Sequence, residues 1–303
     1  MNNRIGFAGI IFDITTFSKL LNVSMKIFIA CCITLLVAGN ANSQNLHPNL
    51  FAGTSNYQGD LQDKAFTFSQ AHFAGGVGLS YDLSKHVSIR SGVTFGTVSA
   101  DDKYGRNQFR NLNFTSPLTE VNVGAEYFIT PLNEHVLTPY LFAGVALYHF
   151  NPYTRDTAGT KYYLKPLSTE GEGFVAGKNN YNLTQFAIPF GAGVKFSLSE
   201  NVNVGVEVGL RKLFTDYLDD VSSTYVDQNL LLANRGAKAE ELAYRGDELK
   251  NGNHNYPLPG TIRGGASKKD WYYFTGLTAS FTLFSGNGLG GRNSKYGCPV
   301  NVN

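Results

Sequence analysis

Apolar and polar residues alternate most clearly along Asn201–Phe214, which reads NVNVGVEVGLRKLF. The even-numbered positions from Val202 to Leu210 are branched aliphatic residues, whereas the odd-numbered positions carry small, polar or charged side chains. A period of two predicts a β-strand with two different faces. In a soluble sandwich the apolar face would pack in a core. In an outer-membrane barrel it would contact lipid, and the polar face would line a lumen.

Seven other segments show the same alternation, the first of them less regularly, and predict further strands. They are Asn49–Asn56, His72–Leu83, Val87–Val98, Leu118–Ile129, Pro139–Phe150, Gln185–Leu198 and Asp270–Phe284. With 201–214 they make about eight strands, which is the size of the smallest closed outer-membrane barrels. The pattern therefore predicts an all-β fold, a closed antiparallel transmembrane β-barrel with long extracellular loops.

The connections between these segments alternate between short and long. The short ones are Leu83–His86, Thr130–Leu137 and Ser199–Asn201, and the long ones are Tyr57–Ala71, Ser99–Pro117, Asn151–Thr184 and Thr215–Lys269. Outer-membrane barrels have short periplasmic turns and long outer loops, so this order favours the membrane barrel over the sandwich. Aromatic residues near the predicted strand ends indicate interfacial girdles. They are Tyr127, Phe128, Tyr148 and Trp271–Tyr273.

The N-terminal region predicts export. A basic start at Met25 precedes an apolar run, Ile27–Gly39, and a group of small residues that ends near Ser43. This order is typical of a secretory signal peptide, and the apolar run is too short to span a membrane as a helix. We place the signal peptide at residues 1–43, with 1–24 as a spurious extension ahead of it.

The three cysteines refine this picture. Cys31 and Cys32 lie inside the apolar run, and acylation of one of them in a lipoprotein is the alternative to a cleaved signal peptide. After cleavage only Cys298 remains, so no internal disulfide is expected. It falls in a predicted periplasmic tail, 285–303, which follows the barrel domain, 44–284.

The net charge and the positions of the charged residues limit the functions that the protein could have. The net charge is +2 and charged residues make up 16% of the chain, which argues against a nucleic-acid partner. Six charged residues fall on the predicted inward faces, three of each sign: Arg90, Glu120, Glu126, Lys195, Glu207 and Arg211. A small barrel has an interior just wide enough for side chains, and buried charges need partners. We therefore predict a lumen charge network that plugs the barrel; a proton or ion path through a narrow pore is the alternative.

Several stretches resemble a known family. They are Gly53–Leu61, Ser99–Asp102, Arg110–Phe114, Phe186–Gly191, Glu207–Ser222 and Asp270–Tyr272, and they include Asn-Tyr-x-Gly-Asp-Leu and Phe-Thr-Asp-Tyr-Leu-Asp-Asp-Val-Ser. On these residues the chain resembles a Bacteroidota family of small outer-membrane β-barrels of unknown function that includes the type IX secretion component PorG. The resemblance implies an outer-membrane location in contact with lipid. We predict a structural or assembly partner, with type IX protein secretion as the candidate process and proteins of a secretion complex as candidate partners.

The longest predicted loop contains two segments that favour helix by propensity, 228–234 and 237–244, separated by Gly236. A short helical element on an outer loop is a candidate surface for a protein partner, and an unpaired exported cysteine can link to another chain. The candidate partner contacts are Leu230, Leu242, Tyr244 and Cys298. By contrast, Asn151–Asn180 has no helix signal and is predicted as a mobile loop.

Two other kinds of site are alternatives. Clustered carboxylates could bind calcium: Asp216, Asp219, Asp220 and Asp227. Their spacing is not that of an EF-hand loop, so a solvated turn, or a brace between the loop and strand ends, is favoured. A rim enzyme acting on lipid or peptide would use residues such as Asp101, Asp102 and His149, but no Gly-x-Ser-x-Gly motif is present. We expect no catalytic residues, no metal and no cofactor.

Overall fold

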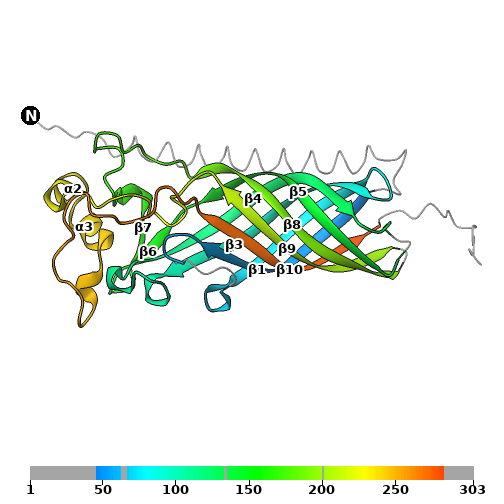
Figure 1. Ribbon diagram of the computed structural model, residues 1–303, viewed down its shortest axis with the longest axis horizontal. Helices are drawn as coiled ribbons and strands as arrows, with labels where there is room; N and C mark the ends of the chain where they lie inside the picture. The colour runs from blue at the N-terminus through cyan, green and yellow to red at the C-terminus, as the bar shows by residue number, and fades with distance from the viewer. Residues whose placement is uncertain (1–45, 63–66, 133–134, 200, 283–303) are drawn as a thin grey trace, which may run out of the picture. The chain divides into compact units, whose positions relative to one another are not determined.

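One closed sheet forms the body of the protein (Figure 1). The computed structural model describes residues 46–62, 67–132, 135–199 and 201–282. Its eight long strands are β1 (Leu46–Gln58), β2 (His72–Asp82), β3 (Val87–Asp101), β4 (Asn113–Phe128), β5 (Leu137–Phe150), β8 (Thr184–Ser199), β9 (Val202–Leu213) and β10 (Trp271–Phe281). Each pairs antiparallel with its neighbours, and β1 pairs with β10, which closes the barrel. The predicted fold class is confirmed.

Large apolar side chains cover the outside of this barrel. Phe73 on β2, Phe186 on β8 and Leu277 on β10 expose 75%, 68% and 64% of their surface. Val206, on β9, is 47% exposed and lies opposite Leu277 in the ladder between β9 and β10. Apolar side chains outside and polar ones inside are typical of a barrel in lipid, because the hydrocarbon region solvates the outer face.

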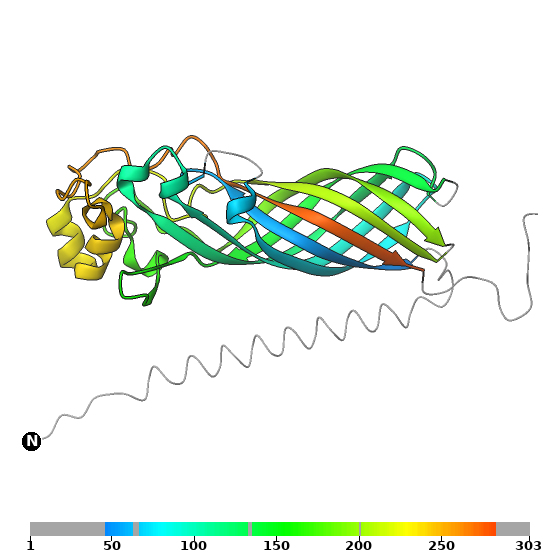
Figure 2. The ribbon, with the colours of Figure 1, turned by 90° about the horizontal axis from the view of Figure 1, so that it is seen from below.

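The connections sort into two ends, as their lengths predicted. The turn end holds the short links β2–β3, β4–β5 and β8–β9, and the loop end holds the long links β1–β2, β3–β4, β5–β8 and β9–β10. The described residues of the first two long links include three short 3-10 helices, η2 (Phe68–Gln70), η3 (Asp102–Tyr104) and η4 (Gln108–Arg110). Figure 2 shows the helices α2 and α3 at the loop end, away from the short turns.

The two longest loops, 151–183 and 214–270, fold into what we call the loop module. Its elements are β6 (Tyr153–Arg155), β7 (Lys161–Tyr163), η5 (Lys165–Leu167), α2 (Gln228–Arg235), α3 (Ala237–Ala243) and η6 (Gly246–Glu248). The helices α2 and α3 meet at Gly236, whose positive φ of 84° favours glycine, so the predicted helical segments and their break are confirmed. The mobile-loop prediction for Asn151–Asn180 missed the β6–β7 hairpin, which pairs with β4. No helix within the described ranges is long and apolar enough to cross a membrane.

A small core holds the two helices in the loop module: Val226, Leu231, Ala239 and Ala243. Leu242 and Tyr244 are also buried, with 1% and 6% of their surfaces exposed. The Leu242 side chain is not available to a partner, which corrects that part of the predicted contact set, whereas Tyr244 lines a pocket of the loop module and stays a candidate. Leu230 is 42% exposed and remains a candidate, and Cys298 lies outside the described residues.

Three aromatic residues predicted to lie in interfacial girdles point into the barrel instead. Tyr148 and Tyr272 are fully buried with their ring centres 5.5 Å apart, and Phe128 is fully buried against Tyr140. The strand alternation explains this, because each of the three falls on the inward face of its strand. Tyr127, which is 55% exposed, has the outward position that a girdle requires.

Candidate functional site

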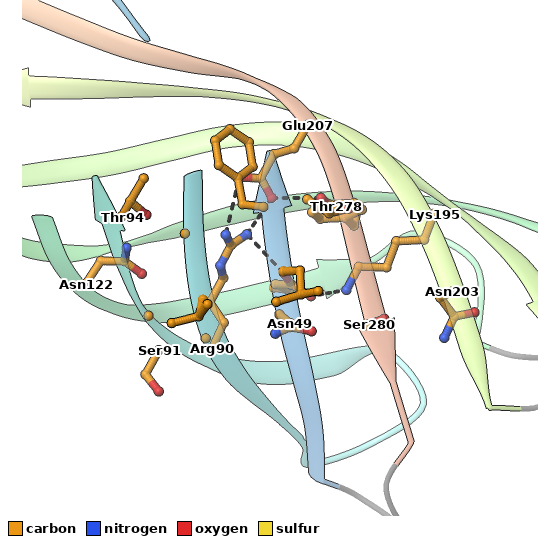
Figure 3. Close-up of a pocket in the computed structure, with 18 residues that line it drawn as sticks. Asn49, Arg90, Ser91, Thr94, Asn122, Lys195, Asn203, Glu207, Thr278 and Ser280 are labelled. Atoms are coloured by element: carbon orange, nitrogen blue, oxygen red, sulfur yellow. Dashed lines mark hydrogen bonds and ion pairs between the residues drawn. The ribbon is translucent and has the colours of Figure 1, made fainter. Parts of the chain in front are cut away.

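Arg90, on β3, lies at the centre of the lumen charges (Figure 3). Its guanidinium donates to Glu207 from β9, at 2.6 and 3.2 Å, and to Glu126 from β4, at 3.0 Å. The three groups meet because each occupies the polar face of its strand, and in a narrow barrel these faces converge. Hydrogen bonds between ionised partners, and bidentate ones above all, are among the strongest in proteins.

Lys195, on β8, extends this group of charges. Its ammonium donates to Glu126 at 2.5 Å and lies 4.9 Å from the ring centre of Tyr140. Tyr140 in turn donates its hydroxyl to Glu207 at 2.8 Å. Gly193 leaves space for that ring, since a Cβ there would lie 2.5 Å from Tyr140. The two cations and two carboxylates therefore form one connected network with a phenol inside it.

Arg211 and Glu120 form a second group, nearer the loop end. The guanidinium donates to Glu120 at 2.9 and 3.1 Å, and Tyr272 donates its hydroxyl to the same carboxylate at 2.7 Å. Both charged residues are buried, with 3% and 0% of their surfaces exposed. Gly209 provides room, because a Cβ there would collide with the Arg211 guanidinium. The structure thus brings the six predicted lumen charges together in two groups, each with as many cations as carboxylates.

Little open space remains between these groups. A cavity of about 50 Å³ lies among Arg90, Asn122, Ser280 and other polar side chains, which is room for only a few water molecules. Toward the loop end, a layer of buried aromatic rings fills the interior: Phe114, Tyr148, Phe150, Tyr272 and Phe274. This layer was not predicted. The paired charges and the aromatic rings both obstruct the passage of ions or solutes through the lumen.

At the base of the loop module, carboxyl groups gather around Tyr57. Its hydroxyl is 2.6 Å from Asp219 and 3.0 Å from Asp270, and both carboxyl groups are buried. A hydroxyl has one proton, so it cannot donate to both. Burial raises the pKa of Asp219 and of Asp270 well above the usual range, and repulsion from neighbouring carboxylates raises each further. Burial also raises the pKa of Asp216 to about 7.

Asp220, which follows Asp219 in the chain, belongs to a brace between the two loops of the module. It accepts a hydrogen bond from Thr169 at 2.7 Å. Glu170, beside Thr169, accepts from the backbone N–H of Ser222 at 2.9 Å and pairs with Arg263 at 3.0 Å. Asp219, Asp220 and these partners are buried, so a solvated turn is wrong for them. The predicted brace to a strand end is made by Asp219, which bonds to Tyr57 of β1, whereas the bonds around Asp220 join the two loops.

The carboxylates considered as calcium ligands do not converge. Asp227 caps α2 by accepting from the backbone N–H of Leu230 at 2.9 Å, while Asp219 and Asp220 bond to different partners. Across the described part of the chain, no group of three or more His, Cys, Asp or Glu is placed to hold a metal ion. Asp219 and Asp220 instead bond to groups of β1 and of the loop 151–183, and burial raises the pKa of both carboxyl groups.

The residues considered for a rim enzyme also have separate partners. Asp102 forms a buried ion pair with Arg110 at 2.6 Å. His149 bonds through Nδ1 to the hydroxyl of Thr184 at 2.9 Å. A hydrolytic site needs a nucleophile or water, a base and an orienting group in mutual reach. These residues do not make such a set with one another.

Raising the pH should loosen the loop module. The raised pKa values of Asp216, Asp219 and Asp270 mean that the folded module binds more protons than the unfolded one. The stability linked to these protons is complete below the ordinary carboxyl pKa and is lost as the pH rises through the folded values, about 7 for Asp216. Limited proteolysis of the module should therefore speed up from about pH 5 to about pH 9.

Asp219→Asn separates this effect from the protease's own pH dependence. The amide imitates a protonated carboxyl group: it donates to Tyr57, whose hydroxyl then donates to Asp270. Parent and variant are compared at the same pH. The variant should be cleaved more slowly than the parent above about pH 7, and the two should be cleaved at equal rates near pH 4. Asp227→Asn is the matched control, because asparagine also caps a helix. Equal alkaline cleavage of parent and Asp219→Asn would contradict the buried-proton explanation.

A closed barrel of eight antiparallel strands, apolar outside and filled with paired charges inside, defines a class of protein, the small membrane-spanning β-barrels. Within this class the chain belongs to the family DUF6089, described as a domain of unknown function, whose model matches residues 25–234. No curated protein matches the chain.

Several solved structures are similar to the chain. Neisserial surface protein A gives a TM-score of 0.39 at 9% identity, over 78% of this chain and 97% of that one. The outer membrane protein OprG from Pseudomonas aeruginosa gives 0.38 at 9% identity, over 78% and 97%. Ail, the attachment invasion locus protein of Yersinia pestis, gives 0.36 at 9% identity, over 78% and 98%.

Proposed function

We propose that the protein is a non-enzymatic outer-membrane β-barrel that acts as a structural or assembly partner of other proteins. The filled lumen carries this proposal. Paired charges and aromatic rings occupy the interior, which favours a role in binding other proteins over a role as a channel. The apolar outer face supports the membrane location. In an outer membrane the loop end, with its long links, faces the exterior and the turn end faces the periplasm.

The loop module is the proposed contact surface. Leu258 and Ile262 are 77% and 78% exposed on it. Ile262, Phe109 and Tyr225 line a pocket of about 520 Å³ that also reaches the buried Arg263. Aromatic and apolar side chains around a pocket suit the anchor residues of a protein partner. The Glu170–Arg263 ion pair beneath the surface makes the module a rigid scaffold for such a contact.

Type IX protein secretion is the process that we propose for this role, supported by the sequence resemblance to the barrels that include PorG. Deleting Leu230–Glu248 would be the simplest test from the sequence. However, this segment contains the buried Leu231 and Leu242, so the deletion would also unfold the loop module. A surface substitution tests the contact without that effect.

We expect a photo-crosslinker at Ile262 or Leu258 to give one adduct of defined mass in intact cells. The same crosslinker at Leu198, 67% exposed near the turn end, should not give that adduct. Leu258→Asp with Ile262→Asp should leave membrane insertion unchanged and reduce both the adduct and the secreted cargo. Normal secretion with an unchanged set of co-purifying proteins would refute the partner role of the module.

A further inference from the structure

The backbone of Ile262 forms an open edge on the loop module. Thr224 and Ile262 face each other in an antiparallel bridge. Two backbone hydrogen bonds of 2.9 and 2.8 Å flank this bridge: Tyr225 N–H to Thr261 and Arg263 N–H to Ser223. The bridge is therefore a non-hydrogen-bonded pair, and the N–H and carbonyl of Ile262 point away from Thr224. Within the part of the chain that the structure describes, neither group has a hydrogen-bond partner, and Ile262 is 78% exposed.

A tight turn holds this edge in place. Pro259, whose ring fixes φ, and Gly260 lie at the centre of the turn, and Thr261 donates its N–H to the carbonyl of Leu258 at 3.0 Å. Gly260 has a positive φ of 83°, which favours glycine, and donates its N–H to the carbonyl of Tyr225 at 2.9 Å. An edge that is already in its binding conformation loses little conformational freedom when a partner binds.

The pocket of about 520 Å³ lies along the same edge. The residues Thr261–Gly265 form one of its walls. Phe109, which is 63% exposed, Tyr225 and Tyr244 also line it, and the rings of the two tyrosines pack edge-on with their centres 6.0 Å apart. Aromatic side chains bury a large apolar area and pack favourably in edge-on or offset arrangements. The pocket therefore suits an aromatic side chain.

The charged residues around this pocket already have partners. Arg110 pairs with Asp102 at 2.6 Å and Arg263 pairs with Glu170 at 3.0 Å. Asp60, which also lines the pocket, accepts a backbone N–H of the loop 214–270 at 2.8 Å. A charge that enters a site without gaining a partner of its own is unfavourable. An uncharged side chain therefore fits this pocket better than an acidic or a basic one.

We propose that the edge at Ile262 binds an extended peptide segment of the protein partner, with an aromatic side chain of that segment in the adjoining pocket. The segment pairs with the N–H and the carbonyl of Ile262 as an added β-strand does. In this mode of recognition the main-chain hydrogen bonds supply affinity and the pocket supplies specificity. The inference rests on the proposed partner role and names the kind of segment that the loop module recognises.

The test measures binding of the peptide acetyl-Ser-Thr-Phe-Thr-Ser-amide to the full-length protein in detergent by saturation-transfer NMR. Its threonines favour an extended chain. The comparison probes are the same peptide with methyl groups on its backbone nitrogens and the same peptide with Asp in place of Phe. We expect the first peptide to bind at least about fivefold more tightly than the methylated one, because methylation leaves the Ile262 carbonyl without a donor. The Asp peptide should also bind more weakly than the first.

Variants of the protein test the pocket and the edge separately. Phe109→Ala should weaken binding of the first peptide at least about threefold, because an aromatic contact is lost. Phe214→Ala is the matched control, because Phe214 is 58% exposed and does not line the pocket. Ile262→Pro removes the N–H of the edge and should weaken binding at least about fivefold. The mobility of unboiled samples on a gel verifies that each variant is folded, and the methylated peptide tests the edge without changing the protein.

Equal binding of the first and the methylated peptide, or unchanged binding in the folded Phe109→Ala variant, would overturn the proposal. The photo-crosslinker at Leu258 distinguishes this failure from that of the proposed function. An adduct in intact cells that an excess of the first peptide does not reduce would leave the partner role standing and overturn the edge at Ile262 as its contact. Peptide binding as expected, without any adduct in cells, would support the edge and count against the partner role.

Discussion

Glu120→Leu should lower the free energy of unfolding by about 3–5 kcal/mol, because it leaves the buried Arg211 charge without its carboxylate. The substitution also removes the acceptor of Tyr272, which donates to Glu120 at 2.7 Å, and that of Asn122, which donates at 3.0 Å. Denaturant titration of the protein in lipid vesicles, followed by the gel mobility of unboiled samples, measures the effect.

Two further variants provide the controls. Glu207→Leu should cost less than Glu120→Leu, because Arg90 keeps Glu126 as a partner at 3.0 Å. Glu120→Gln retains the shape and one acceptor, so its cost should fall between those of the parent and Glu120→Leu. If Glu120→Leu unfolded at the same denaturant concentration as the parent, the buried pair would not be holding the lumen together.

Val206→Arg should destabilise the barrel from the opposite face. Val206 points outward from the middle of β9, 47% exposed, and lies between Val194 of β8 and Leu277 of β10. An arginine on the lipid face costs about 2–4 kcal/mol near the midplane of the bilayer. The same titration in vesicles measures this loss as a shift of the unfolding midpoint.

Depth in the membrane supplies the matched control for this substitution. Leu198 also faces outward, 67% exposed, but lies near the turn end of β8. Leu198→Arg should therefore cost only about 0–1 kcal/mol, as expected near an interface. Equal costs for Val206→Arg and Leu198→Arg would mean that the middle of β9 is not in contact with hydrocarbon.

Local alternation was enough to predict the strands and their faces. Each strand of this barrel has different surroundings on its two faces, so apolar and polar residues alternate along every strand. Val206, for example, points outward, and the next residue, Glu207, points inward. The ion pairs could not be predicted in the same way, because they depend on the register of the closed sheet. Arg90 and Glu207 bond to each other although 117 positions separate them in the chain.

The aromatic layer was missed although a signal for it was present. Tyr148 and Tyr272 fall on the inward face of the strands β5 and β10, but their position near strand ends suggested a girdle. Strand parity was the better guide, because alternation fixes the face on which a side chain lies. Both residues are fully buried in the structure.

The loop module was only partly predictable for a different reason. Helix propensity and Gly236 were sufficient for α2 and α3, since both signals are local. The brace between Glu170 and Arg263 joins two loops whose sequences show no period, and 93 positions separate these residues. Leu242 was predicted to lie on a contact surface because the sequence of one helix shows which of its faces is apolar. It does not show whether another part of the chain packs against that face, as happens at Leu242.

Recording the current across a planar lipid bilayer that contains the purified protein tests the filled lumen most directly. The paired charges and the aromatic layer predict no stable conductance steps beyond those of the protein-free bilayer. Regular steps of a single size in the parent protein, changed in size by Glu207→Leu, would contradict the filled lumen and favour a narrow pore.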